Sequence, residues 1–263
     1  MHTEVLQISL LTAYGKAYIE GKDVSFEKNH PGAYNHRNIR FVAKLPQEQL
    51  IKKDIIAENP NDWFKYLKKE KFIRLHLTYQ PSAYISSKAR LKSVSDNKGS
   101  HWHIIAEKEE KCDIWKSKWQ SESGELMSYY FLMIKDLDLG SVNFPTIETT
   151  KLYLKEILND LVEFTKKNEL TNWIEVFQNA LNYLSIENPS KLIEDDYLPT
   201  GCYSLEAKQI LAACDQAWVF GGIGSWNDVV HVHDYDLYRR LTANLYDTLC
   251  NSIVSAINSY PDK

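Results

Sequence analysis

The densest group of side chains able to bind a metal ion lies near the C-terminus, at His231, His233 and Asp234. Alternate residues of an extended segment point to the same side, so the two imidazoles would face one ion. His101 and His103 repeat this spacing earlier in the chain. A zinc site needs three or four converging ligands, and nothing in the sequence shows convergence. A metal-dependent hydrolase or nuclease is therefore kept as the alternative function, and no metal or cofactor is expected.

Residues 218–228 form the most distinctive segment, because three of the ten glycines fall within four positions and two of the seven tryptophans flank them. A dinucleotide-binding loop needs glycines spaced G-x-G-x-x-G, but Asn227 occupies the third place. A Walker loop needs a lysine that is missing here. We expect a constrained turn after a helix that ends near Ala217, packed onto the last helix by its aromatic residues. The predicted binding residues are Gly221, Gly222, Gly224, Ser225, Trp226, Asn227 and Asp228.

Asp96, Glu109 and Lys111 resemble the D…E-x-K pattern of restriction-type nucleases, in which carboxylates hold Mg²⁺ and lysine stabilises the attacked phosphate. The pattern is short, it lies in the charge run 107–111, and its usual βαβ setting is missing. A solvated hairpin end is the favoured interpretation.

A serine or cysteine nucleophile has little support in the sequence. The chain has no G-x-S-x-G elbow, and its four cysteines form no C-x-x-C pair. Reduced, buried thiols in a cytoplasmic protein are expected instead. The leading interpretation is therefore a non-catalytic protein.

Charge is divided unevenly along the 263 residues. Residues 1–145 carry 22 Lys and Arg against 18 Asp and Glu, a net +4, whereas residues 146–263 carry 9 against 17, a net −8. The acidic half would repel nucleic acid and would attract a basic protein partner. No stretch approaches the ~18–20 apolar residues of a membrane helix, and no basic region precedes a signal-like segment. Abundant lysine, asparagine, isoleucine and tyrosine indicate a bacterial source.

The elements that must position these residues change character near Gly140. Alternating apolar residues predict strands at 38–45, 72–79, 101–107, 113–119 and 129–134, with one helix starting at Asn61 or Asp62 and ending near residue 69. Helical spacing after Gly140 predicts four helices, one along 173–184 and the others capped by Thr146, by Ser204, and by Asp234 or Asp236. The expected fold is α+β: an antiparallel β-rich lobe at 1–140 and a helical lobe at 141–263, sharing one core.

The segment from Ala217 to Asp228 precedes an amphipathic helix with Leu245-Tyr246 and a final Ala256-Ile257-Asn258. These last fifty residues resemble the ends of uncharacterised bacterial proteins of the type that provides immunity to polymorphic toxins. The resemblance transfers no catalytic residue. It implies a cytoplasmic protein that binds and blocks a toxin through surface shape and charge.

Overall fold

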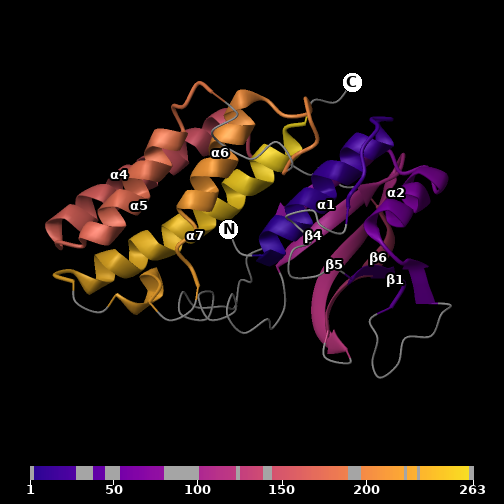
Figure 1. Ribbon diagram of the computed structural model, residues 1–263, viewed down its shortest axis with the longest axis horizontal. Coiled ribbons are helices and arrows are strands. Elements are labelled where there is room, and N and C mark those ends of the chain that lie inside the picture. The colour runs from indigo at the N-terminus through magenta and orange to yellow at the C-terminus, as the bar shows by residue number, and fades with distance from the viewer. Residues whose placement is uncertain are drawn as a thin grey trace.

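The computed structural model describes residues 3–27, 38–44, 54–79, 101–122, 125–138, 144–188, 197–221, 224–229 and 232–260. These residues form a six-stranded sheet and six α-helices, with the sheet preceding most of the helices in sequence (Figure 1). The expected α+β fold is confirmed. No helix among these residues is long and apolar enough to cross a membrane.

The sheet has the strand order β2-β1-β6-β5-β4-β3. Its strands are β1 (Asn38–Val42), β2 (Ile55–Ala57), β3 (Arg74–Tyr79), β4 (Trp102–Glu107), β5 (Lys111–Glu122) and β6 (Glu125–Asp138). The expectation of a wholly antiparallel sheet is wrong, because β1 pairs with β6 in parallel, from Asn38 opposite Met127 to Val42 opposite Phe131. Alternation of apolar residues identifies a strand, but it carries no information about the direction of its neighbour.

The helices are α1 (Thr3–Ile19), α2 (Pro60–Lys69), α4 (Ile147–Lys167), α5 (Thr171–Tyr183), α6 (Leu205–Gln216) and α7 (Tyr235–Asn258). The predicted caps Thr146, Ser204 and Asp234 are confirmed, since each side chain accepts a backbone N–H of the first turn. Neither Asn61 nor Asp62 caps α2. Asn59 does so, followed by proline at the first helical position.

Helix α1 was not expected from the sequence. Its buried residues run almost continuously from Val5 to Ala17, so the helix has no polar face that a periodic pattern could reveal. Both α1 and α2 pack on one face of the sheet (Figure 1). Gly15 permits this approach, because a Cβ at that position would collide with the side chain of Leu75.

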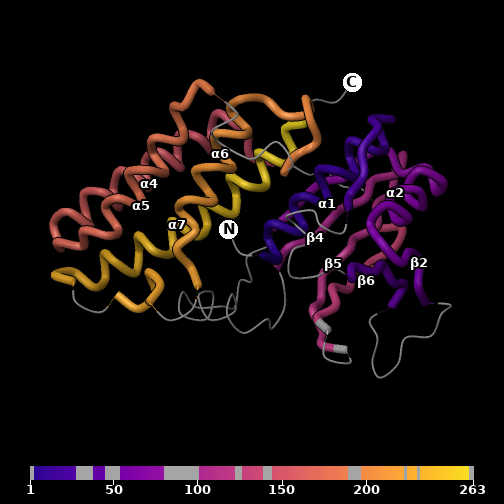
Figure 2. Tube along the Cα trace, viewed as in Figure 1, coloured from indigo at the N-terminus to yellow at the C-terminus, as the bar shows by residue number. Residues whose placement is uncertain are grey.

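The main apolar cluster contains residues from both halves of the chain, including Leu11, Leu75, Ile210 and Ile253. The first and last helices lie near each other in the trace (Figure 2), and they are in contact. Asn258, the last residue of α7, joins the helices to the edge strand β3. Its Oδ1 accepts the Leu77 N–H at 2.9 Å and its Nδ2 donates to the Leu77 carbonyl at 2.8 Å. The division at residue 140 stays a prediction, but a shared core connects the two parts.

Candidate functional site

The predicted binding segment is closed by Trp226, which begins a short 3-10 helix (Trp226–Asp228) and is fully buried. Its indole Nε1 donates to Thr242 Oγ1 of α7 at 2.8 Å. The Tyr238 hydroxyl, also on α7, donates to the Trp226 carbonyl. The indole also packs edge-to-face against two rings of α5, with ring centres 5.2 Å from Phe177 and 5.4 Å from Trp173. The turn therefore rests on a rigid aromatic base.

Hydrogen bonds within the turn use the polar groups that a ligand would otherwise meet. The backbone N–H of Gly224, which has φ +85°, donates to the Asp228 carboxylate at 2.6 Å. The Ser225 hydroxyl donates to the Gly221 carbonyl at 3.4 Å. Gly221, Gly224 and Asp228 remain exposed, whereas Asn227 is half-buried. Gly222 lies outside the described residues. In the part of the turn that the structure describes, the Gly224 N–H is already bonded to Asp228 and is not available to a ligand.

The predicted metal ligands near residue 233 have other roles where the structure describes them. The Asp234 carboxylate accepts the Leu237 N–H at 2.8 Å and so caps α7. The His233 N–H donates to Asn168 Oδ1 at 2.7 Å, which ties the start of α7 to the end of α4. His231 lies outside the described residues. Within the described ranges, no three His, Cys, Asp or Glu side chains form a group that could hold a metal ion.

The carboxylates at this end of the helical half are exposed. Two of them, Asp234 and Asp236, are the chain neighbours of Tyr235, which is 46% exposed and whose ring centre lies 5.6 Å from that of Tyr238. We call this surface the loop end. It consists of Glu169, Asp228, Asp234, Tyr235 and Asp236. The exposed cations Lys166, Lys167, Arg239 and Arg240 lie close to it in sequence.

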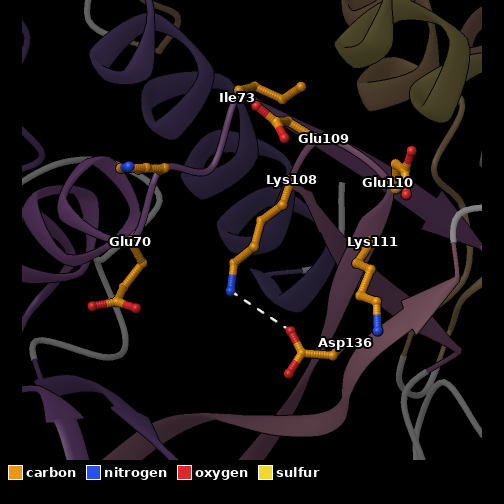
Figure 3. A pocket seen from close by; sticks show the side chains of 8 residues that line it. Glu70, Ile73, Lys108, Glu109, Glu110, Lys111 and Asp136 are labelled. Carbon is orange, nitrogen blue, oxygen red and sulfur yellow. Dashed lines mark ion pairs between the residues drawn. The ribbon is translucent and has the colours of Figure 1, made fainter.

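A charged cleft of about 430 Å³ lies where the end of α2, the segment before β3, β6 and the β4–β5 turn meet (Figure 3). Its lining residues are Glu70, Lys71, Ile73, Lys108, Glu109, Glu110, Lys111 and Asp136. The nuclease-like pair Glu109 and Lys111 is therefore in this cleft, but Asp96 is outside the described residues. In Figure 3 the Glu109 carboxylate lies on the Ile73 side, whereas the Lys111 amine extends on the Asp136 side. Their charged ends point apart instead of converging on one phosphate.

Lys108 spans the cleft. Its ammonium lies 3.8 Å from the Asp136 carboxylate and 4.4 Å from the centre of the Phe72 ring. Asp136 has φ +52° within β6, and its N–H donates to the fully buried Asp113 at 3.0 Å. A β-bulge with a left-handed residue locally distorts a strand. Here the buried Asp113 carboxylate stabilises the distorted backbone at Asp136 by accepting its N–H. Lysines and carboxylates are mixed around the opening, so neither sign of charge prevails for a ligand.

A histidine–carboxylate pair was missed by the sequence analysis. His76 Nε2 lies 2.9 Å from Glu107 Oε2 on adjacent strands, and the imidazole stacks on Phe144 with ring centres 5.1 Å apart. Burial lowers the pKa of His76 more than the glutamate raises it, so the neutral imidazole is favoured in the folded protein. The two residues are 31 positions apart in the chain, so the sequence alone does not bring them together. The pair can be predicted only when the register between β3 and β4 is known.

All four cysteines are buried and free, as expected. Burial raises the pKa of Cys112, Cys214 and Cys250, which disfavours the nucleophilic thiolate. These thiols act as small apolar side chains in the core.

Comparisons with known protein families, with curated proteins and with solved structures find no match to this chain.

Proposed function

We propose that this chain is a non-catalytic, cytoplasmic bacterial protein that binds and blocks a basic protein toxin, as an immunity protein does. The observation that carries the proposal is the loop end, where Tyr235 is exposed between the exposed carboxylates of Asp234 and Asp236 along the chain. Tyrosine supplies a large contact area and loses little conformational entropy on binding. Acidic neighbours accelerate the approach of a basic partner.

The stiffness of this end also supports binding by shape. Trp226, Tyr238 and Thr242 form a continuous set of hydrogen bonds beneath the surface. A surface that is already ordered loses less entropy when a partner docks. The nearby arginines and lysines reduce the local charge, so long-range attraction comes mainly from the net −8 of residues 146–263.

A growth-rescue selection tests the proposal. Fragments of the source genome are expressed from an inducible promoter, with or without this protein, and fragments that are toxic only in its absence are recovered. We expect a basic fragment whose association rate falls steeply as salt rises. The paired substitution Tyr235→Ala and Asp236→Asn should remove protection, whereas Leu126→Ala, at an exposed position on β6, should preserve it.

Two results would contradict this function. One is that no toxic fragment is rescued by the wild-type protein. The other is that a rescued toxin associates at a rate independent of salt, because the acidic half would then contribute nothing to the encounter.

A further inference from the structure

The outer face of α4 exposes two adjacent large apolar residues. Leu152 is 62% exposed and Tyr153 is 59% exposed, more than any other large hydrophobic residue that the structure describes. They lie within a 21-residue helix and not at a fraying end. Single exposed apolar residues are common, but a pair that includes a rigid aromatic ring is typical of an interaction site.

Three carboxylates follow Tyr153 along the same stripe of the helix. Glu156, Asp160 and Glu163 lie three, seven and ten residues further on, and all are exposed. Like charges three or four residues apart destabilise a helix, and this applies to Glu156 with Asp160 and to Asp160 with Glu163. Glu163 has a partner within the helix, Lys166, but helix stability does not account for Glu156 and Asp160, whereas attraction of a basic partner does.

The nearby cations only partly offset this charge. Lys151 is turned inward, since its ammonium donates to Gln209 Oε1 at 2.6 Å. Lys166 lies 3.3 Å from the Glu163 carboxylate. Lys155 is the exposed cation beside Leu152 and Glu156. With Glu148 in the first turn, four exposed carboxylates accompany the apolar pair.

We propose that the α4 outer face, defined as Glu148, Leu152, Tyr153, Glu156, Asp160 and Glu163, anchors the partner protein. The partner would offer an apolar pocket for Leu152 and Tyr153, with lysine or arginine side chains around it for the carboxylates. This inference rests on the proposed function and adds the location and chemistry of the contact.

The apolar pair on α4 lies within one interface width of the end of the helix that precedes the loop end. Tyr153 and Asn168, which receives the His233 N–H, are fifteen residues apart along α4, or roughly 22 Å at 1.5 Å per residue. An interface of standard size covers about 800 Å² of each partner, which corresponds to roughly 30 Å across. A partner that covers Leu152 and Tyr153 can therefore extend to the end of α4, where Glu169 of the loop end follows in the chain.

Selection of displayed random linear peptides tests the inference without a known partner. The wild-type protein should enrich peptides in which lysine or arginine flanks aromatic or aliphatic residues. Their affinity should fall about thirty-fold or more with Leu152→Ala and Tyr153→Ala together. The matched control, Ile73→Ala with Leu126→Ala, removes exposed apolar residues just before β3 and on β6, and it should leave affinity unchanged.

Three results would overturn this assignment. Peptides that bind wild type and the Leu152/Tyr153 variant equally would move the contact away from α4 while leaving the binding function intact. Enriched peptides without basic residues would contradict the charge argument. No enrichment above an unrelated acidic protein would overturn both the α4 contact and the wider proposal. Equal melting temperatures of the variants and wild type would show that loss of affinity is not loss of folding, as expected at such exposed positions.

Discussion

Replacing Asn258 by alanine should weaken the junction between the last helix and the sheet. In the wild type, this one side chain satisfies both the N–H and the carbonyl of Leu77, at 2.9 and 2.8 Å. Strand β3 is the edge of the sheet, so no strand pairs with its outer side and Asn258 takes that place for these two groups. Alanine would leave both groups without a protein partner at a partly buried position, and each such group costs about 1–3 kcal/mol.

We therefore expect a loss of about 2–4 kcal/mol in the free energy of unfolding, with some water access keeping it below the sum of two full penalties. At about 2.1 cal/mol/K per residue, a chain of 263 residues has an unfolding entropy near 0.55 kcal/mol/K, so the melting temperature should fall by about 4–7 °C. Urea denaturation followed by circular dichroism measures the free energy.

Hydrogen exchange makes the test specific to the junction. The Leu77 amide should exchange roughly a hundred-fold faster in the variant, because about 3 kcal/mol of its protection is removed. The Ile104 amide, on the neighbouring strand, serves as the internal reference. The matched control is Ser259→Ala, at the residue after Asn258. It removes only the hydrogen bond from the Ser259 hydroxyl to the Ala256 carbonyl. A stability change below about 0.5 kcal/mol with unchanged exchange at Leu77 would refute the reasoning.

Three further predictions concern single positions. Thr242→Val should lower the free energy of unfolding by about 1–3 kcal/mol, because the buried Trp226 N–H loses its acceptor; a change below 0.5 kcal/mol in urea denaturation would mean that the turn is not closed in solution. Gly15→Ala should lower the free energy of unfolding by about 1 kcal/mol. The collision of the new methyl group with Leu75 outweighs the gain of up to about 1 kcal/mol in helix propensity. A higher melting temperature of the variant would contradict this. Burial lowers the pKa of His103 from 6.5 to about 4. As the pH decreases, the imidazole is therefore protonated in the unfolded chain before it is protonated in the folded protein. The free energy of unfolding should fall between about pH 6.5 and pH 4. His103→Asn should remove roughly 2–3 kcal/mol of that fall, measured as the difference between the two pH profiles; parallel profiles would show that His103 does not titrate in this way.

The local signals of the sequence were sufficient for most elements. Thr146, Ser204 and Asp234 were identified as caps because a short side-chain acceptor precedes an apolar repeat, and this interaction needs no tertiary context. Helix α1 was missed for the opposite reason. It is surrounded by the sheet, α2 and α7, so its apolar residues show no periodicity.

The candidate site shows the same division between local and long-range information. A closed turn after residue 217 follows from glycine density and neighbouring tryptophans, and the hydrogen bond from the Gly224 N–H to the Asp228 carboxylate spans only four residues. The clamp between Asn258 and Leu77 spans 181 residues. No spacing rule finds such a contact, because it depends on which strand forms the edge of the sheet and where the last helix ends.

Histidine and aspartate spacing alone is weak evidence for a metal at residues 231–236. Asp234 accepts a backbone N–H of the helix that it begins, so the same carboxylate that completes the motif has a sufficient structural reason to be there. A ligand recruited from a cap would cost the helix about 0.5–2 kcal/mol unless the metal replaced that hydrogen bond. The carboxylates on α4 differ in this respect from Asp234. Glu156 and Asp160 lie four residues apart on one stripe and repel each other, which destabilises the helix. Charges that cost stability where they stand are better evidence of a partner than charges that the fold itself uses.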